Sequence, residues 1–401
     1  MGKHSGGGGN RQKDDDAKHE QKFQAVLLAD SFVNTFRPVS LDKPKVLCPL
    51  NNVVMLDYAM EFLAGAGVEE IFVVCTSPSV EQYVSRNTWT STIKVVCIQD
   101  AGLTNAGDAL RELDKRNLVQ SDPFLLLSGD VITNVHIGPA LEEHRARRKK
   151  DSSAIMTCLF KEVGGWDCVD THDTDSSKKR DDDNNEDDNN NDNSQSQSTP
   201  KTTYCNLRPA DEDLVVALSK TNRILVYDNH ASRKSTQIPC SFFQAHPLAD
   251  FRSDLLDCGI DICSPDVLAR FSDEFDYRDI RQEFVTNLVA EEEEGLQSKI
   301  YAHLLGPSEY AARVHDFSTY AAISQDLLKR WCYPVVPDNL PSGYEREQHY
   351  ALERRFLYRE RKGRSRMERS SEVIGPGMIG SHCVIGADCR VEVSVQGGKH
   401  V

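Results

Sequence analysis

The sequence predicts an α/β protein: a doubly wound sheet with mostly parallel strands, followed by the first coil of a β-solenoid. Apolar runs alternate with amphipathic helical patterns between residues 23 and 337, which is typical of a sheet with helices on both faces. An aliphatic residue then recurs every six positions over residues 372–395, which is typical of hexapeptide solenoids. The 401 residues are enough for two domains.

The first domain is predicted to follow a polar, glycine-rich tail over residues 1–22, which contains no apolar segment of a secretory signal. Its predicted strands are 25–29, 71–75, 93–99, 124–128, 154–160 and 255–263, with a hairpin over 214–219 and 223–227. Its predicted helices are 54–64, 80–85, 107–117, 137–149 and 265–271, and residues 326–331 close the domain. Ligands of such sheets bind beyond the carboxyl ends of the strands, where the loop 30–37 and the Gly129-Asp130 turn lie.

Residues 167–202 form a low-complexity insert in this domain, rich in Asp, Asn and Ser. Between Gly165 and Pro200 there are 11 acids and three bases, which supply about half of the chain's formal net charge of −15. Such a composition cannot bury a core, so we expect a solvated, disordered insert; a functional acidic patch is the alternative.

Two basic stretches are candidates for binding to nucleic acid. Residues 338–371 are predicted to form a charged connector, in which nine Arg or Lys residues between Arg346 and Arg369 are mixed with five glutamates. This mixture favours a solvated helix or linker over a nucleic-acid arm. The run HRARRKK at residues 144–150 ends a predicted helix, where cations complement the helix dipole. We therefore expect no direct contact with nucleic acid.

Residues 372–395 are predicted to begin a left-handed parallel β-helix. Val373, Ile379, Ile385 and Val391 lie six residues apart, and a glycine follows each isoleucine. One coil cannot bury its own apolar face. We therefore expect either that a partner covers this stub, with Ile379 and Ile385 as candidate contacts, or that the chain is a truncated product.

The remaining composition predicts a cytosolic protein without a metal ion or cofactor. The twelve cysteines include no Cys-x-x-Cys pair, and Cys75, Cys97 and Cys158 lie in apolar strands as small core residues. No apolar run approaches the roughly 18 residues that a membrane span needs. We therefore expect no contact with a membrane.

The stretch AVLLADSFVNTFRPVSLDKPKVLCPL resembles the opening signature of the sugar-nucleotide pyrophosphorylases. Arg37 and Lys45 stand at the family's spacing and could each contact a phosphate or form a salt bridge. The working enzymes have a glycine-rich loop here, because backbone N–H groups must approach the phosphates closely. In this chain Asp30, Ser31 and Phe32 begin that loop, so the predicted phosphate site is only vestigial.

Three further positions bear on this resemblance. Asp130 stands where the nucleotidyltransferase architecture places a carboxylate for Mg²⁺, and a turn cap at the end of the strand is the favoured alternative. The enzymes' Glu-Lys-Pro motif is replaced by residues 227–230, Tyr-Asp-Asn-His, and their Asn-Ala-Gly-Ile-Tyr motif by Asp257-Cys258-Gly259-Ile260-Asp261. Because a catalytic site fails when several of its contacts are lost together, we expect no nucleotidyl transfer.

Together these residues resemble a non-enzymatic branch of the pyrophosphorylase-like proteins, the epsilon subunits of eukaryotic translation initiation factor 2B. The first loop is the most specific piece, because Ala-Asp-Ser-Phe is that family's replacement for the glycine loop. The other matching segments are LLLSGDVITN (125–134), ALEEHRARRK (140–149), LLDCGIDICSP (255–265), EYAARV (309–314) and RWCYPVVP (330–337).

The resemblance implies a subunit of the complex that exchanges GDP for GTP on translation initiation factor 2. It implies that the nucleotidyltransferase-like domain and the solenoid pair with the related gamma subunit, and that a C-terminal domain beyond this chain carries the exchange. A family motif associated with engaging factor 2 reads Asn-Phe-Asp-Tyr; here Glu274 precedes Phe275, Asp276 and Tyr277. An exposed aromatic residue would serve as an anchor, and packing of the loop onto the domain is the alternative.

Two other functions remain open. An active, Mg²⁺-dependent sugar-1-phosphate nucleotidyltransferase should show glycine between Asp30 and Asn34, which this chain does not. A nucleotide sensor would bind nucleotide without turnover.

Overall fold

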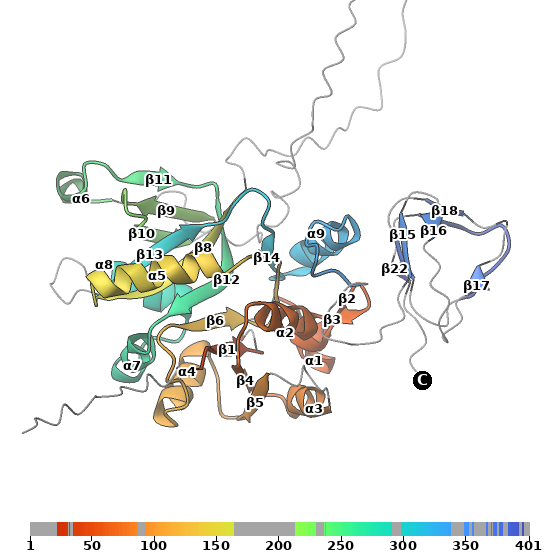
Figure 1. Ribbon diagram of the computed structural model, residues 1–401, viewed down its shortest axis with the longest axis horizontal. Coiled ribbons are helices and arrows are strands. Elements are labelled where there is room, and N and C mark those ends of the chain that lie inside the picture. The colour runs from red at the N-terminus through yellow and green to blue at the C-terminus, as the bar shows by residue number, and fades with distance from the viewer. Residues whose placement is uncertain are drawn as a thin grey trace, which may run out of the picture.

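The structure, a computed structural model, describes residues 22–30, 32, 35–86, 93–163, 213–229, 236, 238–290 and 298–337, and short segments between residues 349 and 396. Its central sheet contains β1 (Gln24–Leu28), β4 (Glu70–Cys75), β5 (Lys94–Gln99), β6 (Phe124–Ser128), β8 (Ala154–Glu162), β12 (Leu255–Cys263) and β13 (Lys299–Leu304). The strand order is β13-β8-β12-β6-β1-β4-β5 (Figure 1). Neighbouring strands are parallel, except that β12 runs antiparallel to both β6 and β8. The predicted α/β fold with a mixed sheet is therefore confirmed.

Alternating side chains along the strands divide the core between the two faces of the sheet. Val26 and Leu28 of β1 lie in one cluster with α4 (Ala106–Lys115), α7 (Asp266–Asp273) and α8 (Thr286–Ala290). Ala25 and Leu27 lie in a second cluster with α2 (Met55–Gly65), α3 (Pro78–Arg86) and α5 (Gly138–Lys150). The sheet is therefore doubly wound, as its alternating pattern predicts.

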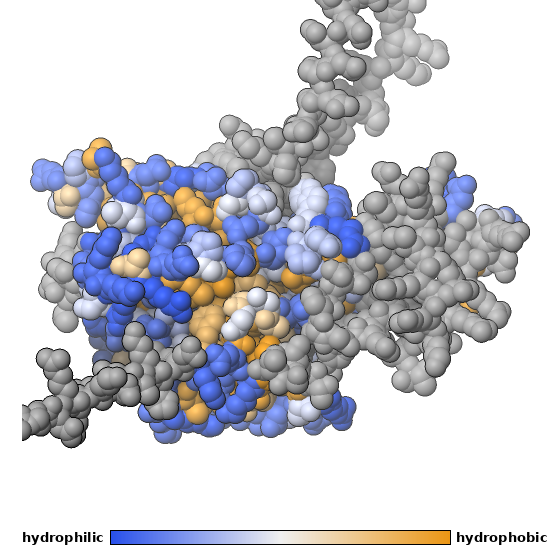
Figure 2. Space-filling view, in the orientation of Figure 1, coloured by the Kyte–Doolittle hydropathy of each residue, from blue (hydrophilic) through white to orange (hydrophobic). Residues whose placement is uncertain are grey.

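Helix α5 ends in the predicted basic run. Its last turn consists of Arg147, Arg148, Lys149 and Lys150. Arg148 forms an ion pair with Asp266, with 2.5 Å between Nη2 and Oδ2. The surface over this helix is hydrophilic (Figure 2). The predicted helix end is confirmed, and Arg148 makes its contact within the domain.

A third apolar cluster lies under helix α9 (Phe317–Leu328). It includes side chains from two strand pairs, β2 (Pro49–Leu50) with β3 (Val53–Val54) and β7 (Val131–Thr133) with β14 (Ala311–Arg313). The helix begins with a capping box, in which the Asp316 carboxylate accepts from the Thr319 N–H and the Thr319 hydroxyl accepts from the Asp316 N–H. The sequence pattern predicts only a closing segment over 326–331 here, whereas the helix begins nine residues earlier, at Phe317.

A smaller antiparallel sheet has the order β10-β9-β11 and contains β9 (Leu214–Leu218), β10 (Ile224–Asn229) and β11 (Asp250–Arg252). The predicted hairpin is β9 with β10. The short helix α6 (Cys240–Ala245) precedes β11. The acidic insert 167–202 and the tail 1–21 lie outside the described residues.

The C-terminal segments form parallel strand pairs with a regular offset. The strands are β17 (Arg366–Met367), β18 (Glu372–Ile374), β19 (Gly377–Ile379), β20 (Val384–Ile385), β21 (Arg390–Glu392) and β22 (Val395–Gln396). In β17 with β20, Arg366 pairs with Val384, and in β18 with β21, Glu372 pairs with Arg390. Both offsets equal three hexapeptides, so this register fits the hexapeptide period. In β19 with β22 the offset is one residue shorter. The left-handed sense of the coil stays a prediction.

The predicted connector 338–371 is wrong in one respect. It contains β15 (His349–Leu352), β16 (Arg355–Phe356) and β17, and these strands pair with one another or with solenoid strands. Strand pairing uses backbone groups, so a charged segment can join a sheet without an apolar pattern. Leu328 of α9 packs against Met378 of β19, which joins the two parts of the chain. None of the described helices is long and apolar enough to cross a membrane.

Candidate functional site

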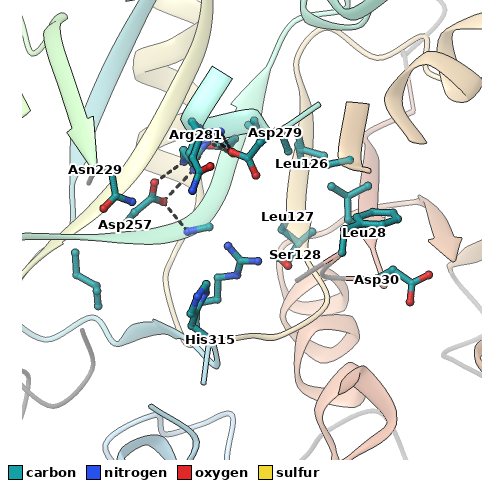
Figure 3. Close-up of a pocket in the computed structure, with 18 residues that line it drawn as sticks. Leu28, Asp30, Leu126, Leu127, Ser128, Asn229, Asp257, Asp279, Arg281 and His315 are labelled. Atoms are coloured by element: carbon teal, nitrogen blue, oxygen red, sulfur yellow. Dashed lines mark hydrogen bonds and ion pairs between the residues drawn. The ribbon is translucent and has the colours of Figure 1, made fainter. Parts of the chain in front are cut away.

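A hollow of about 150 Å³, here termed the cleft, lies where the carboxyl ends of β1 and β6 meet β12. Leu28 and Asp30 come from the end of β1, and Ser128 comes from the end of β6. Figure 3 shows Asp257 and Arg281 on one side of the cleft and Asp30 on the other. The cleft is therefore at the predicted ligand position of an α/β sheet.

The described residues of the first loop, Asp30 and Phe32, both line the cleft. Phe32 has a φ of 51°, in the left-handed region that glycine favours. Its side chain packs against the core and lines the cleft. Asp30 also lines the cleft, and its carboxylate accepts a hydrogen bond from the Thr76 N–H. A ring and a negative charge therefore lie where the resemblance places phosphate; Ser31 is outside the described residues.

Lys45 and Asp130, the vestigial phosphate and Mg²⁺ contacts, bind each other. The Lys45 Nζ lies 2.7 Å from Asp130 Oδ2, and the Arg313 Nε lies 2.9 Å from Asp130 Oδ1. These three residues are the Asp130 cluster. Asp130 is fully buried, and neither it nor Lys45 lines the cleft. Arg37 is exposed and does not line the cleft either.

The charges of the Asp130 cluster hold the carboxylate in its ionised form. Burial alone would raise the pKa of Asp130, but Arg313 and Lys45 outweigh burial and hold the pKa well below its usual range. Burial lowers the pKa of Lys45, and Asp130 offsets only part of that effect. Because each Asp130 oxygen already accepts a hydrogen bond from a cation, the residue is poorly placed to ligate Mg²⁺.

The wall of the cleft that faces Asp30 is built around one arginine. Arg281 belongs to a π-helical turn, η4 (Ile280–Val285). Its Nη2 lies 3.0 Å from Asp257 Oδ1 and 2.8 Å from Asp261 Oδ1. Its Nη1 lies 2.9 Å from Asp261 Oδ2, and its Nε also donates to Asp257. These three residues are the Arg281 cluster, and both aspartates belong to the altered motif 257–261.

A bulge in β12 brings the two aspartates to one guanidinium. Four steps along β12, from Asp257 to Asp261, pass only two steps of the neighbouring β8. Gly259 lies within the bulge with a φ of 65°, and its N–H donates to Asp257 at 2.9 Å. Burial would raise the pKa of Asp257, but Arg281 outweighs it and lowers that pKa; at Asp261 burial dominates and raises the pKa.

The charged groups on the described walls are thus largely engaged with one another. A sugar phosphate needs cations that are available to it, whereas Arg281 is held by two carboxylates and Arg313 by Asp130. Among the described residues, no group of three or more His, Cys, Asp or Glu side chains could hold a metal ion. Asn229 keeps a buried Oδ1 atom that has no hydrogen-bond partner within the described part of the chain, so a ligand could still find one acceptor here.

The predicted partner-binding loop separates into an exposed and a buried part. Phe275 is 76% exposed, and Asp276 is exposed as well. Tyr277 is only 4% exposed, and its ring packs against Phe271 and Phe284 at centroid distances of 5.9 and 5.4 Å. The expectation of an exposed aromatic residue is therefore met by Phe275 and is wrong for Tyr277, which holds the loop on the domain.

The two isoleucines of the solenoid differ in the same way. Ile379 is 2% exposed, whereas Ile385 is half-buried. Neighbouring Val384 is 74% exposed. Ile379 is therefore covered within this chain and cannot offer its side chain to a partner, while a contact at Ile385 stays a prediction.

The sequence pattern does not reveal the two arginines of the clusters. Arg313 is 183 residues away from Asp130, and Arg281 is 24 and 20 residues away from Asp257 and Asp261. The only available signal is the pair of aspartates itself, because two carboxylates in an otherwise apolar strand require a cation when they are buried.

Comparison with known proteins agrees with this geometry. The Nucleotidyl transferase family matches residues 24–173. The translation initiation factor eIF2B subunit epsilon of Dictyostelium discoideum is 35% identical over 376 residues, which are 93% of this chain and 46% of that protein. Its counterpart in Schizosaccharomyces pombe is 36% identical over 346 residues, 84% of this chain and 45% of that protein. A putative mannose-1-phosphate guanyltransferase of Sulfolobus acidocaldarius is 28% identical over 141 residues, 34% of this chain and 37% of that protein. The chain therefore spans about half the length of the two eIF2B relatives.

Proposed function

The chain belongs to the family of the eIF2B epsilon subunits, and we propose that it is a scaffold and regulatory subunit of the guanine-nucleotide exchange complex that acts on translation initiation factor 2. Its nucleotidyltransferase-like domain serves subunit assembly and factor binding instead of catalysis. It pairs with the gamma subunit of the complex and works in the cytosol, without a cofactor.

One observation carries the loss of catalysis. The residues that the enzyme resemblance assigns to phosphate and metal, Lys45 and Asp130, are bound to each other behind the cleft. On the cleft wall, the altered motif is occupied by the Arg281 guanidinium. A charged substrate would have to displace buried ion pairs. Breaking such a pair in a low-dielectric site costs several kcal/mol.

The test of this claim is a transferase assay with GTP, mannose 1-phosphate and Mg²⁺. We expect no pyrophosphate release above the background of a blank, while an active mannose-1-phosphate guanylyltransferase gives product under the same conditions. Turnover that disappears in the Asp130→Ala variant would establish the enzyme and refute the scaffold. Saturable heat on titration with GTP or a GDP-sugar, without turnover, would instead establish a nucleotide sensor.

The assembly claim is tested separately. We expect the 401-residue chain to co-purify with the gamma subunit and to show no stimulation of GDP release from initiation factor 2 when used alone. GDP release stimulated by this chain alone would contradict the proposal that another part of the family's longer proteins carries exchange. Failure to co-purify with gamma would contradict the scaffold itself.

A further inference from the structure

The segment between Asp273 and Val285 runs from the exposed Phe275 ring to the wall of the cleft. Residues 279–282 line the cleft, and Arg281 among them is clamped by two carboxylates. Phe275 lies six residues before Arg281. The contact that holds Arg281 therefore also limits where Phe275 can move.

Hydrogen bonds join the loop and the π-helical turn into one unit. The Asp279 carboxylate accepts from the N–H groups of Arg281 and Gln282, each at 2.7 Å. The Glu283 carboxylate reaches back and accepts from the N–H groups of Arg278 and Asp279. The loop before Asp279 and the turn after it are therefore tied together, and a shift of Arg281 is transmitted to the loop.

Helix α4 supports the other end of the same loop. A Cβ atom on Gly107 would lie 2.0 Å from the Tyr277 carbonyl oxygen, so a side chain there would force the two segments apart. Arg111 Nη1 donates to that carbonyl at 3.0 Å, and the Arg111 guanidinium carbon lies 5.7 Å from the centroid of the Phe275 ring. The Arg111 guanidinium thus orients the ring, while most of the surface of the ring stays exposed.

The surroundings of Phe275 specify the kind of surface that it fits. Its neighbours Asp273, Glu274 and Asp276 are all exposed. An aromatic ring whose sequence neighbours carry exposed carboxylates is complementary to an apolar pocket with a basic rim. The ring loses the least rotamer freedom on binding if it is already fixed.

We propose that Arg281 is a positioning residue: through its ion pairs to Asp257 and Asp261 on the cleft wall, it fixes the loop 274–279 so that Phe275 is presented in one conformation to a partner with a basic-rimmed apolar pocket. The wall of the cleft then holds residues 274–279, which are here termed the docking loop. The partner half of this inference, that Phe275 binds a partner, rests on the proposed function, in which that partner is initiation factor 2. The loop half, that Arg281 fixes the loop, does not rest on it.

The loop half is tested by ¹⁹F NMR on the 401-residue chain with 4-fluorophenylalanine at position 275. We expect one narrow resonance in the parent chain and a broadened or split resonance in Arg281→Met. Because Arg281→Met leaves two buried carboxylates and could fail to fold, the neutral combination Arg281→Met, Asp257→Asn and Asp261→Asn is measured beside it. Arg281→Lys should restore part of the narrow signal. Arg252→Met, which removes ion pairs that include no residue of the loop 274–279, should leave it unchanged.

The partner half is tested by the affinity for purified initiation factor 2. We expect Phe275→Ala to weaken binding about tenfold or more, as a truncated anchor does, and the neutral combination to weaken it less. Both should still co-purify with the gamma subunit. We also expect the parent's association to slow as salt rises.

Each result is decisive. An unchanged ¹⁹F resonance in Arg281→Met and in the neutral combination would overturn the positioning role and show that α4 and Tyr277 suffice. A changed resonance with full binding by Phe275→Ala would overturn the docking role, while co-purification with gamma would leave the scaffold function standing. Loss of gamma binding in the parent chain would instead contradict the proposed function.

Discussion

The Asp130 cluster and the Arg281 cluster are two neighbouring groups of buried ion pairs with opposite charge. In the first, a carboxylate lies between two cations, so the fixed charges sum to +1. In the second, a guanidinium lies between two carboxylates, so they sum to −1 when both are ionised. The two clusters are neighbours, because a Cβ on Gly259 would lie 3.2 Å from Arg313 Cδ.

Under the proposed function, their difference shows how a substrate site can be converted. Two members of the Asp130 cluster, Lys45 and Asp130, are residue types that the enzyme resemblance keeps, here bound to each other. The Arg281 cluster is built on positions where that resemblance is broken. Under the proposed function, Lys45 and Asp130 are thus kept as a structural ion pair, and the Arg281 cluster occupies the altered motif on the cleft wall.

The largest expected effect comes from breaking the Arg281 cluster. Arg281→Met leaves Asp257 and Asp261 buried without their cation, which should lower the free energy of unfolding by about 3–5 kcal/mol. Denaturant unfolding measures it. Arg252→Met is the matched control, because its partners Glu162 and Asp254 are 54% and 30% exposed; it should cost less than about 1 kcal/mol. Equal losses in the two variants would contradict the claim that burial makes the Arg281 cluster special.

The Asp130 cluster should break at a somewhat smaller cost. Asp130→Asn leaves Lys45 and Arg313 without a carboxylate and should cost about 3 kcal/mol at neutral pH. Lys45 can then lose its proton, since burial already lowers its pKa. The cost should therefore shrink as the pH is raised from 7 to 9, and a constant difference between variant and parent over that range would show that Lys45 does not relax in this way.

The contact between α4 and the docking loop should come next. Gly107→Ala places a methyl group against the Tyr277 carbonyl oxygen and should cost about 1–3 kcal/mol by overpacking. Gly65→Ala is the matched helical control, because nothing lies within 4 Å of its added Cβ. We expect that variant to be neutral or slightly stabilised. Similar thermal unfolding of the two variants would contradict the tight approach at Gly107.

The smallest expected effect is a gain in stability, and it comes from a buried carboxylate outside both clusters. Asp326 accepts from the Tyr310 hydroxyl at 3.1 Å, its Oδ1 has no hydrogen-bond partner among the described residues, and burial raises its pKa to about 6. Its folded pKa lies above the unfolded value, so the stability present at low pH is lost as the pH rises through about 6.

Asp326→Asn removes this pH-dependent cost. We expect the variant to gain about 1–2 kcal/mol over the parent at pH 8 and little at pH 4, since the gain follows the ionisation of the parent residue. Thermal unfolding between pH 4 and 8 measures it. A gain that does not depend on pH would show that Asp326 is not ionised in the folded parent.

Features that depend on residues close together in the sequence could be predicted, whereas features that depend on contacts between distant residues could not. Strands β6 and β12 begin and end at the predicted residues, because a buried strand has a continuous apolar run between polar turns. The strands β15 to β17 have no such run and were not predictable from their charged sequence. The positions of Asp30 and Phe32 on the cleft follow from strand order. The burial of Asp130 by Lys45 and Arg313 does not, because it depends on contacts over 85 and 183 residues.

The strand register at the C-terminal end limits how this part of the chain can change in length. Arg366 pairs with Val384 and Glu372 with Arg390, so each position has its counterpart three hexapeptides later. A duplication of three hexapeptides would add a complete rung and leave every later side chain on its own face. A duplication of a single hexapeptide would rotate each later strand onto the next face. The shorter offset between Met378 and Val395 shows that a turn can absorb the loss of one residue while both strands stay paired.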